Sequence, residues 1–560
     1  MLKRFELTTI NSDQNQVFKF GLLLNSHLVE EWQAETIKLL LDEGHQLEIV
    51  VLNNEQHVKK SFVQYLKSYP FDRFLFRFWS RFIFRPLSKQ TVDISQIIRS
   101  IKTLEVKPQK KSFVSYFSDQ DIIHIKSHNL DFLLRFGFNI LKGDILNAAQ
   151  FGIWSFHHDD EQEYRGSPPG FWEFLHKKPQ NGIILQRLTE NLDKGIILKK
   201  IWLPVIKHSY KAHLDQLYFE SCMMPLLVCR QIKLPEFEAS ASTSSAKIYT
   251  PPGNIKMLYF LFLTIYRRLI FHLDFLLVQE DWHIAVINTF IRDFQINDHK
   301  LNWLERKKKT SYLADPFIFE YSNETFLFAE RFDYQKGKGD LVAFKKSDGF
   351  KEQYALLNEN NHLSFPFVIN IDDIIYCIPE CYNSNAIKLY QFDAALMKLV
   401  FQKNILDDFQ AVDPVIFKFE ERWWLFFTLK SMPSVHLYAF YSDKPFDNYK
   451  PHNNNPIKTD IRSSRNAGTP FLEGGKVYRL SQDCSSHYGR AVNICEITVL
   501  TPTTFEEKII ARIDPKKGEK YSKGLHTFNR TSNLAVIDSK RFTFSLFGLR
   551  HQLLQKFKLR

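Results

Sequence analysis

The sequence predicts two domains of different class, a mainly parallel Rossmann-like α/β domain followed by an all-β propeller of five blades. Three observations support this prediction. The 560 residues exceed the size at which one hydrophobic core stays undivided. A strand, a helix and a second strand follow one another between residues 18 and 52, an order typical of a parallel sheet. The second half repeats a pattern of short strands roughly every 50 residues, which is typical of propeller blades.

Composition and charge limit the class of protein. Hydrophobic residues make up 44% and charged residues 24%, as in globular proteins, which excludes a mainly disordered chain. A net charge of +12 favours acidic partners such as phosphates, anionic sugars or a membrane surface. Six cysteines without a C-x-x-C pair predict neither a disulfide framework nor a metal site. Without an apolar leader at the N-terminus, we expect a cytoplasmic protein, working in solution or at the inner face of the membrane.

The first elements follow from apolar runs. Residues 18–24 and 47–52 are candidate buried strands, and residues 30–41 have the periodicity of a helix between them. Asn25-Ser26-His27 follows the first strand without the glycines of a dinucleotide fingerprint, so the sequence gives no support for a nucleotide cofactor there.

Residues 71–87 have helical periodicity with an arginine at every fourth position. One interpretation is a helix packed on the core with a solvated basic face. The other is a helix that lies on an anionic membrane surface, which makes residues 71–87 a candidate peripheral membrane contact. The apolar and basic stretch 255–279 leaves the same two interpretations open.

Domain boundaries are predicted from changes in composition. Residues 238–251 are rich in Ser, Ala and Thr and precede Pro251-Pro252-Gly253, as expected of a linker. The predicted divisions are an α/β domain over 1–235, a linker and helical connector over 236–304, a propeller over 305–545 and a C-terminal tail over 546–560.

The repeat of the second half is marked by prolines. Each unit has a small or acidic residue, a proline, an apolar strand, a polar turn and a second apolar strand. The prolines lie at 316, 366, 414 and 470, and a degenerate fifth unit starts at Leu525. Units of this length made of short strands predict a five-bladed propeller.

Carboxylates recur at matching places in these units. Asp315 and Asp413 precede the prolines of units one and three, whereas Glu330, Glu380 and Asp483 lie near the end of the second strand of their units. Carboxylates gathered around a propeller axis suit a sugar site, because they bind vicinal hydroxyls and act as acid and base. The alternative is that an aspartate before proline only caps a turn.

The second half resembles the N-terminal domain of glucosamine inositolphosphorylceramide transferases. The resemblance lies in ADPFIFE, HLSFPFV, IPE, AVDPVIF, RWWLFFT, IRSSRNAG and SQDCSSHYG. The pattern of short strands and turns is also similar to that of five-bladed furanosidase-type glycoside hydrolases. This similarity implies that Asp315 matches the family's general base and that Asp413 matches the aspartate that adjusts the pKa of the general acid. The place of the acid is occupied by Asn466-Ala467-Gly468, which argues against ordinary hydrolysis.

Residues 120–200 resemble the folate-dependent formyltransferase superfamily through FGFNILKGDIL, a strand that ends in a histidine, an Arg-Gly pair, GIILQRL and LDKG. The resemblance implies a catalytic His157 and Asp193, with Ser155 at the place of the family's asparagine. It also implies 10-formyltetrahydrofolate as the cofactor. Arg165 is a candidate for binding a phosphate or carboxylate of the substrate. The acidic residues 159–161 are either a solvated turn or a site for an ammonium group.

The chemistry of formyl transfer explains these residue types. An amine attacks the formyl carbon, and the resulting oxyanion needs hydrogen-bond donors where its charge develops. An imidazole moves the amine proton, and a carboxylate fixes the imidazole's tautomer. Ser155 would supply a hydroxyl in place of the amide.

These features lead to three hypotheses. The first is a formyl or related one-carbon transferase acting on an amino sugar that is nucleotide- or lipid-linked, for a surface polysaccharide or glycolipid. In this hypothesis the propeller recognises carbohydrate. We expect no nucleic acid as a partner, because the formyltransferases of this superfamily that act on tRNA carry a small basic β-barrel after the catalytic domain, and this chain has the propeller there. The second makes the propeller a glycosidase or glycosyltransferase and the first half non-catalytic. The third has both halves only binding glycans.

Overall fold

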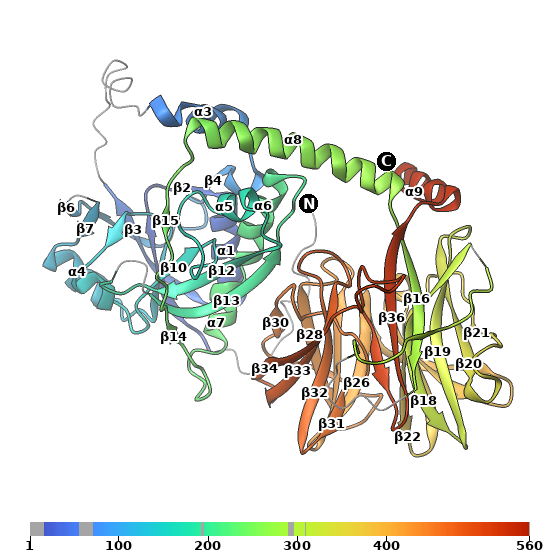
Figure 1. Cartoon of the computed structure of the whole chain (residues 1–560). Coiled ribbons are helices and arrows are strands. Elements are labelled where there is room, and N and C mark those ends of the chain that lie inside the picture. Colours follow the sequence, from blue (N-terminus) through green and yellow to red (C-terminus); the bar gives the residue numbers. More distant parts are fainter. Residues whose placement is uncertain are drawn as a thin grey trace. The chain divides into compact units, whose positions relative to one another are not determined.

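The computed structural model describes residues 16–54, 71–111, 113–191, 195–288, 296–308 and 310–558. The chain forms two compact units, an α/β unit that ends at Leu269 and a propeller unit that begins at Ile270. Figure 1 shows the helices and strands of both units.

The α/β unit is built on one eight-stranded sheet. Strands β10, β8, β1, β3 and β5 run parallel to one another, whereas β12, β13 and β14 pair antiparallel with their neighbours. The predicted mainly parallel sheet is therefore confirmed. In spatial order the strands are β14 (Ser240–Ala241), β13 (Ile196–Pro204), β12 (Gln180–Arg187), β10 (Ile153–His157), β8 (Phe132–Arg135), β1 (Lys19–Leu24), β3 (Gln46–Asn53) and β5 (Lys102–Val106).

Helix α1 (Glu31–Asp42) confirms the helix expected between the first two strands. Glu30 and Gln33 form a capping box that satisfies the first backbone amides, and Trp32, Ile37 and Leu40 are buried. The other helices of the unit include α4 (Asp119–Lys126), α5 (Phe171–Leu175), α6 (Tyr210–Ser221), α7 (Met224–Cys229), η3 (Leu87–Lys89) and η4 (Asp144–Asn147). Short strands pair as β2 (Leu28–Glu30) with β4 (Thr91–Asp93), β11 (Arg165–Gly166) with β15 (Ile248–Tyr249), and β6 (Gln109–Lys111) with β7 (Val114–Tyr116) and β9 (Ile140–Leu141).

The arginine-rich segment is helical but shorter and less regular than expected. It consists of η1 (Phe71–Arg73), α3 (Phe74–Phe78) and the π-type turn η2 (Trp79–Ile83). The helix cannot continue to residue 87, because Pro86 disfavours helical backbone in the residue before it.

The propeller unit consists of five antiparallel sheets, which confirms the predicted fold class. Blade one is β18 (Ser311–Tyr321), β19 (Glu324–Asp333), β20 (Lys338–Lys345) and β21 (Tyr354–Leu357). Blade two is β22 (Ser364–Ile371), β23 (Ile374–Glu380), β24 (Ala386–Asp393) and β25 (Lys398–Asp407). Blade three is β26 (Ala411–Phe419), β27 (Arg422–Leu429), β28 (His436–Ser442) and β29 (Lys450–Pro451), with β30 (Lys458–Thr459) also on β28. Blade four is β31 (Phe471–Glu473), β32 (Lys476–Asp483), β33 (Ala491–Leu500) and β34 (Phe505–Ile513).

Blade five is assembled from both ends of the unit. It contains β17 (Asn302–Trp303), β16 (Gln279–Ile287), β36 (Ala535–Thr543) and β35 (Phe528–Arg530), and β16 pairs with β36 along its whole length. Pairing the first and last strands closes the propeller and removes a free sheet edge.

This closure changes the predicted divisions. Part of the expected connector 236–304 belongs to blade five, and β14 and β15 of the expected linker pair with strands of the α/β unit. The α/β unit accordingly runs beyond residue 235, and the propeller starts before residue 305. The composition concealed β14 and β15, because main-chain hydrogen bonds hold a strand of two residues whatever its side chains. A helix, α9 (Leu546–Lys558), occupies the expected tail.

A strained backbone position repeats at the start of three blades. The register of β18, β22 and β26 shifts at Asp315, Phe365 and Asp413, and these residues have φ values of 50°, 42° and 48°. Positive φ is uncommon outside glycine and is a genuine outlier for a bulky residue such as phenylalanine. Such positions persist only where the surroundings hold them, so the strain marks a part of each blade fixed by its neighbours.

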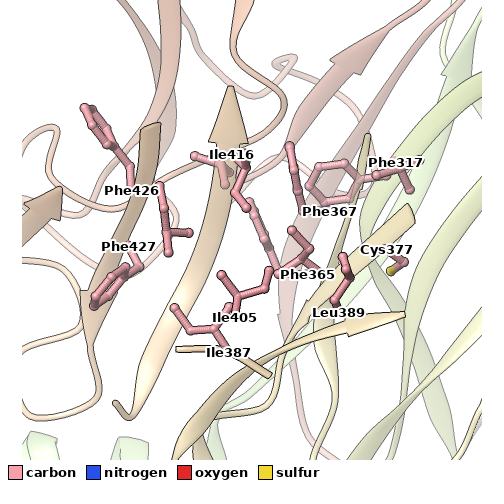
Figure 2. Packing of buried hydrophobic residues seen from close by; sticks show 14 of the residues in the cluster. Phe317, Phe365, Phe367, Cys377, Ile387, Leu389, Ile405, Ile416, Phe426 and Phe427 are labelled. Carbon is pink, nitrogen blue, oxygen red and sulfur yellow. The ribbon is translucent and has the colours of Figure 1, made fainter. Parts of the chain in front are cut away.

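The propeller core explains the high phenylalanine content. Figure 2 shows Phe317 of blade one beside Phe365 and Phe367 of blade two. The ring of Phe317 lies 4.8 Å from that of Phe365 and 6.1 Å from that of Phe367, both edge to face. Aromatic rings in this geometry fill the wedge between blades.

Helix α8 (Asn254–Leu277) contains the border between the two units. None of the described helices is both long enough and apolar enough to cross a membrane. All six cysteines are buried with free thiols.

Candidate functional site

Three neighbouring strands of the α/β unit bring polar side chains together. Arg135 ends β8, Ser155 lies in β10, and Gln186 of β12 is the residue opposite Ser155. The Ser155 Oγ accepts hydrogen bonds from Arg135 Nε at 3.2 Å and from Nη2 at 3.0 Å. Arg135 Nη1 also donates to the Asn139 carbonyl at 2.9 Å, so the guanidinium is held from two sides. Burial lowers the pKa of Arg135, and hydrogen bonds to a desolvated cation are strengthened.

A cavity of about 130 Å³ opens beside Arg135. Gln186, Asn191 and Gly195 also line it. Asp193 lies outside the described residues, between Asn191 and Gly195 in the sequence. The side chains of Arg135 and Gln186 offer N–H donors to anything in this cavity, which suits an oxygen that gains negative charge.

The cavity is small for the expected cofactor. Sites that enclose a drug-sized ligand have volumes of roughly 300–1,000 Å³. The described walls therefore enclose at most a part of 10-formyltetrahydrofolate. A larger cavity, of about 700 Å³, lies near Asn129 and Gly152, at the amino ends of β8 and β10. Open α/β sheets bind their ligands at the carboxyl ends of the strands, so this second cavity is not a candidate site.

His157 is the last residue of β10 and therefore lies at a carboxyl end of the sheet. Its Nε2 is 3.1 Å from the Tyr164 carbonyl oxygen. A carbonyl only accepts, so Nε2 carries a proton and Nδ1 is the basic nitrogen of the neutral ring.

The acidic residues after His157 are buried, so the interpretation of a solvated turn is wrong. Lys200 Nζ lies 2.8 Å from Asp160 and 3.0 Å from Glu161. Asp159 accepts the Gly170 amide at 2.5 Å and lies beside Glu173. Burial raises the pKa of Asp159, and burial together with the Asp159 carboxylate raises the pKa of Glu173 well above its usual range. These two carboxyls therefore favour sharing a proton.

Arg165 lies in β11, where its Nη1 donates to the Ala246 carbonyl at 3.3 Å. This contact ties it to the chain before β15. Arg165, like Ser155 and His157, is not among the residues that line the cavity beside Arg135.

In the propeller unit, blade one and blade five meet at Asp315. Its Oδ1 accepts from the Thr527 hydroxyl at 2.9 Å and lies 3.4 Å from His526 Nε2. His526 Nδ1 lies 2.7 Å from Asp538 Oδ2, and the Asp315 amide donates to the same oxygen at 2.9 Å. Burial raises the pKa of Asp315 to about 6 against the opposing effect of His526. Burial alone would lower the pKa of His526, but Asp538 and Asp315 outweigh it and raise that pKa.

These three residues form the group best able to hold a cation among the described residues. One ligand atom each from Asp315, His526 and Asp538 lies within 4.8 Å of the others. The sequence predicted no metal. The raised pKa of His526 favours a proton on the ring, which competes with a metal for the same nitrogen.

Blades two, three and four meet at Asp413. Glu380 Oε2 accepts the Asp413 amide at 3.1 Å. Arg465 Nε donates to Asp413 Oδ2 at 2.6 Å, and its guanidinium lies 3.7 Å from Glu380. Burial, with the neighbouring Asp413 charge, raises the pKa of Glu380 well above its usual range. Asn466, at the place of the expected acid, donates its amide to the Asp413 and Phe426 carbonyls at 2.8 and 3.1 Å.

Glu330 belongs with this group, whereas Asp483 has other partners. Burial, followed by the charges of Asp315 and Glu380, raises the pKa of Glu330 well above its usual range. Asp483 forms ion pairs with Arg490 at 3.0 Å and Arg512 at 2.7 Å. Four of the five carboxylates predicted from the sequence therefore lie close enough for their charges to interact. They are Asp315, Glu330, Glu380 and Asp413. Protonated and ionised carboxyls together donate to and accept from sugar hydroxyls.

Sequence reasoning missed the basic and amide partners in both places. They are the basic or amide side chains Arg135, Gln186, Arg465 and His526, and the carboxylate of Asp538 was missed with them. Arg135 carried a signal, because a cation at the end of the apolar run FLLR needs a partner. The sequence gives no signal for Asp538 and His526, because these residues meet Asp315 only when the propeller closes.

A known protein family matches a part of the propeller unit. Residues 302–541 match the family model described as glucosamine inositolphosphorylceramide transferase 1, N-terminal. Glucosamine inositolphosphorylceramide transferase 1 of Arabidopsis thaliana is 33% identical over 207 residues, which are 35% of this chain and 27% of that protein. The match thus spans about a quarter of the relative's length.

Two solved structures are also similar. An α-L-arabinofuranosidase from Podospora anserina covers 42% of this chain and 93% of its own, at 12% identity and a TM-score of 0.34. Glycinamide ribonucleotide transformylase 1 from Symbiobacterium toebii covers 41% of this chain and 95% of its own, at 13% identity and a TM-score of 0.27. The resemblance of residues 302–541 to the N-terminal domain of glucosamine inositolphosphorylceramide transferases is confirmed.

Proposed function

We propose that this chain is a transferase that acts on an amino sugar. In this proposal the α/β unit transfers a formyl or related one-carbon group, and the propeller binds the carbohydrate. The observation that carries it is the grouping of Arg135, Ser155 and Gln186 on adjacent strands: Arg135 and Gln186 line one cavity, and the buried Ser155 hydroxyl holds the Arg135 guanidinium from behind.

The chemistry of the α/β site follows from these donors. When an amine nitrogen attacks an acyl carbon, the carbonyl oxygen becomes negative and needs N–H or O–H donors already in place. The Ser155 oxygen accepts from Arg135, which leaves its own proton to donate. In this proposal His157, which ends the strand that contains Ser155, takes the proton released by the amine on its Nδ1.

The carbohydrate part rests on the propeller carboxyls and on the relatives. Glu330, Glu380 and Asp413, with the Arg465 guanidinium, offer both donors and acceptors to hydroxyls. The Arabidopsis relative is named a glucosamine inositolphosphorylceramide transferase, so a sugar on a nucleotide or lipid carrier is the substrate class we propose.

The α/β half is tested by mass spectrometry of products. The full chain is incubated with 10-formyltetrahydrofolate and nucleotide-linked amino sugars, and formylated sugar is measured. Replacing Arg135 by Met should reduce the rate about 10²–10³-fold, as expected for the loss of one oxyanion donor. Arg187→Met is the matched control, because Arg187 lines the other cavity. No formylated product with any acceptor, together with no thermal shift from folates, would refute this half.

The propeller half is tested separately by binding. Amino sugars should raise the melting temperature of the full chain, and Asp413→Asn should remove that increase. Asp447→Asn is the control, because this exposed carboxylate of blade three pairs with the exposed Lys403 at the surface. Equal shifts in both variants would show that the sugar does not bind at Asp413.

The second candidate makes the propeller itself catalytic. It is favoured by Asp315, whose pKa of about 6 beside His526 suits a general acid or base near neutral pH. Glycoside cleavage or glycosyl transfer that survives Arg135→Met and is lost in Asp315→Asn would favour this candidate.

A further inference from the structure

The α/β unit exposes a row of aromatic rings on its helical segment 71–83. Phe71, Phe74, Phe78 and Phe82 recur at three- or four-residue spacing, and Phe71 is 83% exposed. Successive rings lie 6.3, 6.1 and 5.3 Å apart, so they form one continuous ridge. Monomeric soluble proteins rarely expose contiguous apolar surface of this kind unless it binds something.

The first part of α8 exposes a second apolar stripe. Its members recur at alternating spacings of three and four residues, which places them on one face of the helix. They are Ile255, Leu258, Phe262, Ile265 and Leu269, all more than half exposed. The opposite face of the same turns is buried, through Met257, Phe260 and Leu263.

The two segments are fixed side by side. The Asn254 side chain accepts the Leu75 amide at 2.9 Å and donates to the Phe71 carbonyl at 2.8 Å. The Trp79 ring packs on Phe260 at 5.4 Å within the buried cluster below. Figure 1 shows α3 beside the start of α8. The inward faces of both segments are therefore anchored, and their outward stripes belong to one surface, which we term the aromatic face.

The charges around the aromatic face are almost all positive. Residues 71–92 contain Arg73, Arg77, Arg81, Arg85 and Lys89 against one acid, Asp72. In α8, Lys256, Arg267 and Arg268 precede the first acid, Asp274. A second copy of so basic a surface would be repelled, whereas each basic residue near an anionic bilayer strengthens the attraction to it.

A cavity at the edge of the aromatic face has the same mixed chemistry. It has a volume of about 520 Å³, and its walls include Phe76, Trp79, Phe84 and Tyr210 together with Arg85 and Lys89. Lys89 pairs with Glu30 at 3.5 Å, so Arg85 is the cation of these walls that we expect to meet a ligand. Aromatic walls beside a cation suit an amphiphile with an anionic head group.

We propose that the aromatic face docks the α/β unit on an anionic lipid bilayer. The phenylalanines and the α8 stripe enter the boundary between head groups and acyl chains, and the arginines bind lipid phosphates. The buried side chains of the two segments hold them on the α/β unit while the aromatic face is inserted in the lipid. This docking is independent of the proposed transfer reaction.

Flotation of the full chain with vesicles tests the proposal. The probes are vesicles of phosphatidylcholine alone and of phosphatidylcholine mixed equally with phosphatidylglycerol. Binding should be stronger to the anionic vesicles and should weaken with added salt. The double variant Phe78→Ser, Phe262→Ser should bind at least about tenfold more weakly, because two buried rings are lost. Arg81→Glu with Arg85→Glu should remove the preference for anionic vesicles.

The matched control is the double variant Phe401→Ser, Leu472→Ser, which removes two exposed apolar side chains of blades two and four. It should bind like the unmodified chain. Several outcomes would overturn the proposal: no binding to either vesicle, equal loss in both double variants, or self-association in solution that Phe78→Ser, Phe262→Ser abolishes. The last result would assign the aromatic face to a second copy of the chain.

Discussion

A buried ion network in blade four supports the candidate sugar site. Glu507 of β34 accepts from Arg479 at 2.9 and 2.5 Å and from Lys458 at 2.7 Å. Arg479 is fully buried and donates to Asn466 Oδ1 at 3.1 Å. Asn466 in turn donates to the Asp413 carbonyl. The network therefore positions backbone and side chains at Asp413.

The magnitude of this network follows from the pKa of Glu507. Burial by itself would raise that pKa, but Arg479 and Lys458 outweigh it and lower the pKa from 4.5 to about 2. A difference of that size corresponds to about 3 kcal/mol of folding free energy. Because the folded pKa is depressed, this stability is present above pH 4.5 and is lost as the pH falls through about 2.

We expect Glu507→Gln to destabilise the propeller by about 3–5 kcal/mol, because it leaves the Arg479 charge buried without a counterion. Native-state hydrogen exchange of blade-four peptides measures the change. The control is Glu496→Gln in the same blade. Its partner Lys476 is 57% exposed, so we expect no measurable loss of stability from this substitution. Equal effects of the two substitutions would refute the reasoning, as would a Glu507→Gln effect below about 1 kcal/mol.

Three further predictions concern the site and its supports. Ser155→Ala should lower kcat more than it raises KM in the formylation assay, because its hydroxyl would act mainly in the transition state. Glu173→Gln should raise the melting temperature at neutral pH. Because the pKa of Glu173 is raised in the folded protein, the stability that this residue contributes is complete below its unfolded pKa and is lost as the pH rises through the folded pKa. Glutamine stays neutral beside Asp159 at every pH, so the variant does not have this loss. Gly468→Ala should destabilise blade four by at least about 1–3 kcal/mol in urea titrations, because φ is +152° and a Cβ would lie 2.2 Å from the Phe528 carbonyl oxygen.

Local patterns in the sequence were sufficient for the fold class. Apolar runs flanking a helical period predicted β1, α1 and β3, because burial on both faces of a parallel sheet requires continuous apolar residues. The proline-marked units predicted the blades, because each blade repeats the same strand–turn–strand burial pattern. Asp315 and Asp413 were identifiable because they occupy the same place in two units.

The partners of these residues depended on tertiary structure. Asp538 meets Asp315 across 223 residues only because β16 and β36 close the propeller. Arg135 reaches Ser155 because β8 and β10 are parallel neighbours, a register that neither strand encodes by itself.

Residues 71–87 show the same division. Their periodicity determined a helix with an apolar and a basic side, and it left open which apolar residues would be buried. The structure decided that Phe76 and Trp79 pack inward while Phe74 and Phe78 remain exposed. The physical reason is that periodicity is a local property of the chain, whereas burial depends on which distant surface, here α8, covers each face.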